Sequence, residues 1–253
     1  MKKIILAAAL SVAFPFAASA APVDLSSWIS EEGNGSGAAN WQVQGAGNDS
    51  VYQSQNSRPS VFYKSGANAQ GTSLAGKITV ETSNDDDFIG FVLGFNSGEF
   101  GSTNADFWLI DWKQGNQGTA AIGLSLSHVT GDVSAAPEND FWTHTGVVNE
   151  VQRATNLGST GWGDFQTNDF ELVFTSTLIE VKVNNVVELS YTSAQHGSLF
   201  TDGSFGFYNY SQGAVRYAGI TEDVVPGAVP LPAGAWLMLT AMGGIAAMRR
   251  RKG

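Results

Sequence analysis

The sequence contains no cysteine, only seven prolines and only 13 basic residues among its 253 residues. Without cysteine, a disulfide scaffold, a thiolate metal site and a cysteine nucleophile are excluded. The 30 glycines are scattered rather than periodic, which excludes a collagen-like chain. The 43% share of apolar residues and the 11% share of aromatic residues are those of a folded protein rather than a disordered polymer.

The basic residues are also concentrated at the two ends of the chain. Lys2, Lys3 and the run 249–252 hold six of them, which leaves seven basic residues against 23 acidic ones and a net charge of −16 in between. Such a body repels the phosphates of nucleic acids, so nucleic-acid binding is excluded. It favours cation binding or simple solubility.

Residues 1–20 have the order of a secretory signal peptide. Lys2 and Lys3 precede an apolar run from Ile4 to Phe16, and the small residues of Ala18-Ser19-Ala20 follow. A buried core helix would not require this order at the extreme N-terminus. We expect an exported protein whose mature chain begins at Ala21.

The C-terminal segment, residues 226–253, predicts an apolar helix. The 20 residues from Val229 to Met248 are long enough to cross a bilayer of roughly 30 Å, and Arg249, Arg250 and Arg251 follow them. Its start, Val229, Pro230, Leu231, Pro232 and Ala233, resembles the VPLPA and PEP-type sorting signals of Gram-negative bacteria. That resemblance implies processing by a membrane sorting transpeptidase and delivery to the cell envelope, outer surface or extracellular matrix. A simple membrane anchor is the alternative.

Residues 21–225 read as one all-β domain. The segments rich in Val, Ile, Phe, Tyr or Thr, each bounded by Gly, Asn or Asp, predict strands. They are 73–82, 87–95, 106–112, 120–128, 169–175, 178–184, 186–192, 204–210 and 214–220. Many short strands without helical periodicity predict a two-sheet antiparallel sandwich.

Two local patterns sharpen this prediction. Asn184-Asn185 between two strands predicts a two-residue hairpin, because asparagine tolerates a positive φ. The segment Phe88–Phe95 is apolar on both faces, which predicts a central strand whose glycines allow a neighbouring layer to approach closely.

Seven segments of this domain share one resemblance: Asn84–Phe95, Phe107–Gln114, Gly123–Leu126, Trp142–Gly146, Val151–Arg153, Gly161–Phe165 and Gly203–Phe207. Together they resemble the C-terminal domain of thrombospondins, an L-type-lectin-like, concanavalin A-like jelly roll. The resemblance covers about residues 75–220 and implies calcium-dependent extracellular adhesion or ligand binding without catalysis.

The adjacent carboxylates of Asp85, Asp86 and Asp87 are the most informative candidates. Because they repel one another at neutral pH, a bound divalent cation would stabilise them. Calcium takes six to eight hard oxygen ligands in flexible geometry, and Asn84 could add another. The alternative is a solvated acidic loop that caps a strand.

Asp111 shares a predicted strand face with Phe107 and Leu109. It is interpreted either as an exposed edge carboxylate or as a metal or sugar ligand on a sandwich face. Trp142 and Trp162 lie in a glycine-rich stretch and are candidate sugar contacts, since an aromatic face packs on a pyranose; core packing is the alternative. For His144 we expect a structural hydrogen bond.

The functional prediction is a calcium-supported adhesion or glycan-binding protein whose partner is an extracellular glycan or a matrix protein. A structural matrix or biofilm protein without a specific ligand is the alternative. A glycan-cleaving enzyme is less consistent with the sequence, because such enzymes need two carboxylates about 5 to 9 Å apart. Glu171, Glu180 and Glu188 form no compact run of that kind.

Overall fold

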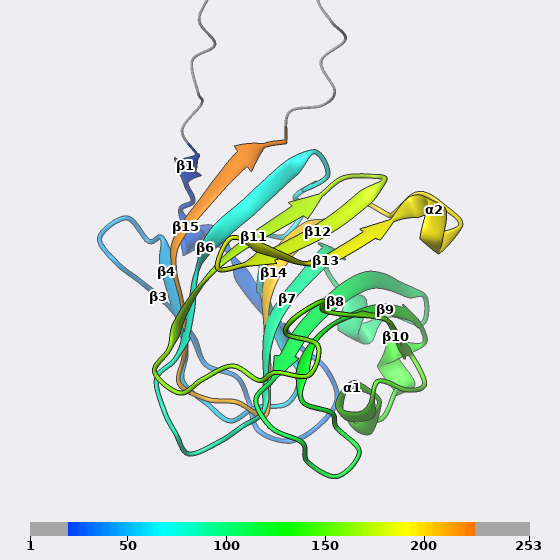
Figure 1. Ribbon diagram of the computed structural model, residues 1–253, viewed down its shortest axis with the longest axis horizontal. Coiled ribbons are helices and arrows are strands. Elements are labelled where there is room, and N and C mark those ends of the chain that lie inside the picture. The colour runs from blue at the N-terminus through cyan, green and yellow to red at the C-terminus, as the bar shows by residue number, and fades with distance from the viewer. Residues whose placement is uncertain (1–19, 226–253) are drawn as a thin grey trace, which may run out of the picture.

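Residues 20–225 are described by the computed structural model, and fifteen strands carry the fold (Figure 1). Their bounds are β1 Ala21–Pro22, β2 Ile29–Glu32, β3 Trp41–Gln44, β4 Ser50–Gln53, β5 Ser60–Tyr63, β6 Thr72–Val80, β7 Phe88–Phe95, β8 Ala105–Lys113, β9 Gly123–Gly131, β10 Val148–Arg153, β11 Thr167–Phe174, β12 Leu178–Val183, β13 Val186–Thr192, β14 Ser204–Tyr210 and β15 Val215–Val224. The helices are short: η1 Leu25–Ser27, η2 Glu99–Gly101, η3 Val133–Ala135, α1 Asn139–Thr143 and α2 Ser193–His196.

The strands form two antiparallel sheets. The eight-stranded sheet has the order β13-β12-β11-β6-β15-β4-β3, with β1 paired to β15, and the seven-stranded sheet has the order β10-β9-β8-β7-β14-β5-β2. The predicted all-β jelly-roll sandwich is thereby confirmed. Because β1 pairs with β15, the two ends of the described chain lie side by side (Figure 1).

The main hydrophobic core fills the space between the sheets. Alternate residues of β7 point into this core, and Phe91 among them packs against Phe170 of β11 and Tyr217 of β15 from the other sheet. Phe207 of β14 stacks on Tyr217 with ring centroids 4.5 Å apart. Burial of these rings contributes to the hydrophobic stabilisation of the fold.

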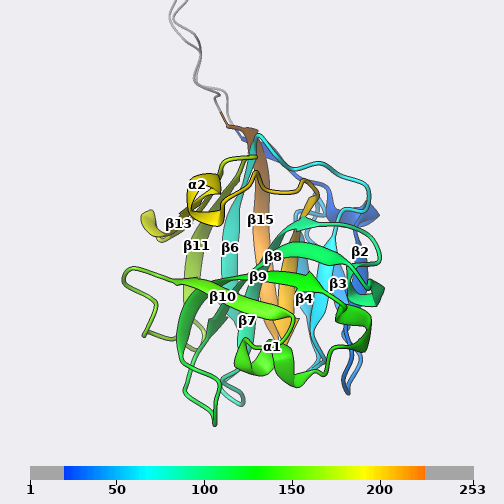
Figure 2. The ribbon, with the colours of Figure 1, turned by 90° about the vertical axis from the view of Figure 1, so that its right-hand side faces the viewer.

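A second hydrophobic cluster covers the outer face of the seven-stranded sheet. Phe88 and Val92 of β7 lie in it, and Phe100 of η2, Val133 of η3 and Phe141 of α1 close over them. Figure 2 shows this side, with α1 beside β7 and β10. All eight residues of β7 are therefore buried, which confirms the prediction of a central strand.

Several predicted details are confirmed and others need correction. Asn184 and Asn185 adopt φ values of 51° and 64° and turn β12 into β13. β9 begins at Gly123 rather than at residue 120, because Gln117 and Ala120 pair with each other and the ladder with β8 starts at Lys113. The sequence does not predict strands β1 to β5, because each holds at most four residues, too few to show a period. It does not predict β10 either.

The signal-peptide segment 1–19 and the C-terminal segment 226–253, with its sorting motif and arginines, lie outside the described residues. Within the described part of the chain, no helix is both long and apolar enough to cross a membrane.

Candidate functional site: an acidic turn joined to an aromatic hollow

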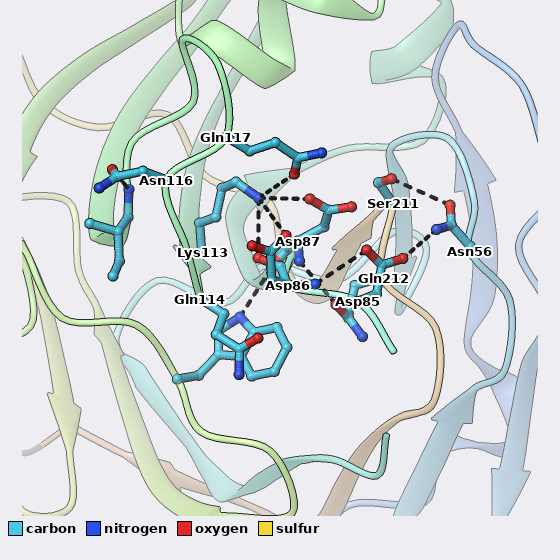
Figure 3. A network of polar contacts seen from close by, with 12 residues as sticks. Asn56, Asp85, Asp86, Asp87, Lys113, Gln114, Asn116, Gln117, Ser211 and Gln212 are labelled. Atoms are coloured by element: carbon cyan, nitrogen blue, oxygen red, sulfur yellow. Dashed lines mark hydrogen bonds and ion pairs between the residues drawn. The ribbon is translucent and has the colours of Figure 1, made fainter. Parts of the chain in front are cut away.

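The loop between β6 and β7 brings the three predicted carboxylates together. We call Asp85, Asp86 and Asp87 the acidic turn, and each offers an oxygen within 4.8 Å of the others (Figure 3). Asp87 is buried, whereas Asp85 and Asp86 are only half-buried. Asn84 precedes them in an exposed position, and its backbone N–H donates to Thr82 Oγ1.

A lysine ammonium enters this turn from the end of β8. Lys113 is 0% exposed, and its Nζ lies 2.6 Å from Asp87 Oδ1 and 3.5 Å from Asp86 Oδ1. It also donates to Gln117 Oε1 at 3.2 Å (Figure 3). Lys113 thus compensates part of the repulsion between the three carboxylates. Three carboxylates with one ammonium leave a formal charge of −2.

Neighbouring loops hold the turn in place. Asn56 Nδ2 donates to Asp85 Oδ2 at 2.5 Å, and the Asp87 backbone N–H donates to Gln212 Oε1 at 3.0 Å. Burial, and then the adjacent Asp87 carboxylate, raises the pKa of Asp85 to about 6. The crowding of negative charge around Asp85 is therefore only partly relieved within the protein.

The donor set fits a hard divalent cation. The available groups are carboxylate oxygens, two of the three carboxylates can be reached from solvent, and the residual charge of −2 matches one such ion. Lys113 occupies one oxygen of Asp87, so Asp85 and Asp86 would provide the more accessible ligands.

An aromatic hollow lies on the other side of Lys113. Pro137, Glu138, Asn139, Trp142 and Tyr210 line an open depression of about 560 Å³, which we call the aromatic hollow. The half-buried ring of Trp142 lies edge-on to Tyr210, with centroids 5.5 Å apart, and Lys113 Nζ lies 4.8 Å from its centroid. Burial, and then Glu138, raises the pKa of the Tyr210 hydroxyl.

Trp162 is not available to a ligand, which corrects its prediction as a sugar contact. Its side chain is 3% exposed and belongs to the core between the sheets. Its indole N–H donates to the backbone oxygen of Asp87 at 3.0 Å. Trp162 therefore supports the acidic turn from the interior.

Asp111 also lies elsewhere than expected. It is 1% exposed, because β8 is an inner strand whose outer face is covered, and the structure does not bring it into the acidic turn. Its carboxylate accepts from Ser125 Oγ and pairs with His144 Nε2, both at 2.8 Å. The predicted structural hydrogen bond of His144 is thereby confirmed, and Asp111 is its partner rather than an edge carboxylate.

The isolated glutamates are also structural. Glu188 is buried and accepts the backbone N–H groups of Asn156 and Leu157. Glu171 and Glu180 both lie near Lys182 on the outer face of the eight-stranded sheet. Both carboxylates are thus paired with the same lysine.

Sequence reasoning missed Lys113, Gln212 and Tyr210. A signal existed for Lys113, because it follows Phe107, Leu109 and Asp111 at the alternate spacing of one strand face. Gln212 and Tyr210 lie more than 90 residues from Lys113 and the acidic turn and at least 68 from Trp142, and no local pattern marks them.

We predict that Lys113→Met destabilises the protein by about 3 to 5 kcal/mol, because it leaves the buried Asp87 carboxylate unpaired. Urea unfolding of the variant measures this loss. The double variant Lys113→Met/Asp87→Asn removes both charges and should recover part of it. Equal stability of the wild type and the single variant would show that the ion pair is unimportant.

We also predict a pH effect centred on His144. Burial lowers the pKa of this imidazole, but Asp111 and then Glu150 outweigh burial and raise it to about 10. Because the folded-state pKa exceeds the unfolded value, the contribution is complete below about pH 6.5 and is lost as the pH rises toward 10. Wild-type stability should fall by about 3 to 5 kcal/mol over this range. In His144→Gln the fall should be absent, and parallel curves for the two proteins would contradict the prediction.

A solved carbohydrate-binding module shares the sandwich fold. A carbohydrate-binding module, CBM66 from Bacillus subtilis, superposes with a TM-score of 0.51 at 9% identity, covering 78% of this chain and 95% of that chain. A toad ovary galectin in complex with thio-digalactose has a TM-score of 0.41 at 11% identity, with coverage of 64% and 98%. At 9% identity the likeness to CBM66 concerns the fold alone.

Sequence comparison is more specific. Thrombospondin-2 of Gallus gallus is 25% identical over an alignment of 202 residues that covers 73% of this chain and 16% of that protein. The chain thus spans about a sixth of the length of this relative. The family model for the thrombospondin C-terminal region matches residues 36–224, nearly the whole described sandwich. The chain belongs to the thrombospondin C-terminal region family.

Proposed function

We propose that this protein is a non-catalytic extracellular adhesion module that binds glycan or matrix, supported by a calcium ion at the acidic turn. The observation that carries the proposal is the position of Lys113. Its ammonium contacts Asp87 at 2.6 Å and lies over Trp142 at 4.8 Å, so one buried group joins the candidate ion site to the candidate ligand site.

A bound calcium ion would act by ordering the acidic turn. An ion held by Asp85 and Asp86, with a contribution from Asp87, would offset the charge that Lys113 leaves uncompensated. The acidic turn is bonded to the loops that carry Asn56 and Gln212, and these loops would then be fixed as well.

The aromatic hollow has the chemistry of a saccharide site. An indole face packs against the C–H face of a sugar ring, while the Glu138 carboxylate and the Asn139 amide offer hydrogen bonds to hydroxyls. The family match supports an extracellular location, and the sandwich fold is compatible with glycan binding. Export by residues 1–20, and sorting to a Gram-negative envelope through residues 226–253, are parts of this proposal that rest on sequence.

We predict that calcium raises the melting temperature. A site with a Kd of about 10 μM gains about 2.7 kcal/mol in 1 mM calcium, which is about 5 to 10 °C for a domain of this size. Asp85→Asn/Asp86→Asn should lose this shift, whereas Glu180→Gln/Asp223→Asn removes two distant carboxylates and should keep it. A melting temperature that is the same in calcium, magnesium and chelator would leave the acidic turn a solvated loop.

Glycan binding is expected to depend on Trp142. On an array of neutral and acidic glycans in the presence of calcium, Trp142→Ala should bind at least tenfold more weakly than wild type, because it loses the stacking face. Phe165→Ala removes an exposed aromatic ring that does not line the hollow and is the matched control. If the wild-type protein binds no glycan on the array, a structural matrix protein without a specific ligand would be favoured.

A further inference from the structure

The outer faces of the two sheets differ in how far other segments of the chain cover them. Loops and α1 bury the outer face of the seven-stranded sheet, as described above. On β6, β11 and β12 of the eight-stranded sheet, the outward side chains include Lys77, Asp169, Glu171 and Lys182, all of them exposed or half-exposed. This second face is therefore open to a ligand.

A hollow lies in the middle of this open face. Ala75 and Gly219 form its floor, and it has a volume of about 270 Å³; we call it the sheet hollow. A bulge between Ala218 and Thr221 interrupts the ladder of β15 with β6, and Gly219 there has a φ of 61°. A Cβ at Gly219 would meet no atom within 4 Å, so no packing contact fills the space above it.

Charged groups of both signs line the sheet hollow. Lys77 Nζ lies 2.5 Å from Asp169 Oδ1, and Lys182 Nζ lies 3.1 Å from Glu171 Oε2. Such solvent-exposed ion pairs add little stability. Each ammonium has three N–H donors and each carboxylate several lone pairs, so both pairs keep donors and acceptors for a further group.

This balance of charge selects the class of ligand. Two ammonium groups and two carboxylates line the hollow, which gives no net attraction for a polyanion. The one ring in the lining, Phe170, is 3% exposed, so an apolar anchor of a protein partner finds little to contact. Hydroxyl groups, which both donate and accept, match paired ammonium and carboxylate groups.

We propose that the sheet hollow binds one sugar unit of a neutral polysaccharide. Its volume is slightly below the roughly 300 Å³ at which ligand pockets begin, so it holds a single ring of a longer chain. It lies on the face of the sandwich opposite the aromatic hollow. If both sites bind, and this step rests on the proposed function, one domain can cross-link two glycan chains.

The test is amide NMR of the purified protein titrated with cellohexaose, laminarihexaose, xylohexaose and mannohexaose. The proposal expects at least one of these to shift the amide signals of Ala75, Lys77 and Gly219. Ala75→Leu fills the floor and should weaken this binding at least tenfold. Ser73→Leu, a similar change one outward position away on β6, should leave it unchanged.

Two results would overturn the proposal: no shift at these amides with any of the four sugars, or equal binding by Ala75→Leu and wild type. The Trp142→Ala variant separates this site from the proposed function. Shifts at the sheet hollow should persist in it, whereas shifts confined to Trp142 and Tyr210 would support the aromatic hollow and refute the sheet hollow.

Discussion

A fully buried ammonium group, that of Lys113, joins the acidic turn to the cover of the seven-stranded sheet. Burying a charge is unfavourable unless partners compensate for it, and Lys113 finds them in Asp87, Gln117 and the ring of Trp142. These partners come from three separate segments. The position of each segment is thereby tied to one group, and Lys113 links the candidate ion site to Trp142 of the candidate ligand site.

The second constraint is that only one of the two outer sheet faces is covered by other segments. One face carries aromatic residues and is closed by η2, η3 and α1, so its polar residues, Asp111 and His144, must satisfy each other. The other face carries charged residues and stays open. The closed face orders loops around the acidic turn, and the open face leaves a hollow where β15 bulges.

The family relation fits this arrangement without fixing the ligand. A domain match covering residues 36–224 establishes the fold and its ancestry, but ligands are bound by particular side chains on that fold. In this chain the side chains proposed for that role include Trp142 and Tyr210, whose placement depends on a five-residue helix and on the end of β14.

The sequence by itself determined the all-β class, nine of the strands, the Asn184-Asn185 hairpin and the adjacency of Asp85 to Asp87, because each is a local pattern of a few neighbouring residues. Tertiary structure decided which side chains meet. It buried Trp162 and Asp111, which look exposed in a linear reading, because long-range pairing put both under cover. It also brought Lys113 into the acidic turn, since contacts between residues far apart in the chain follow from sheet order and loop packing, which leave no local trace.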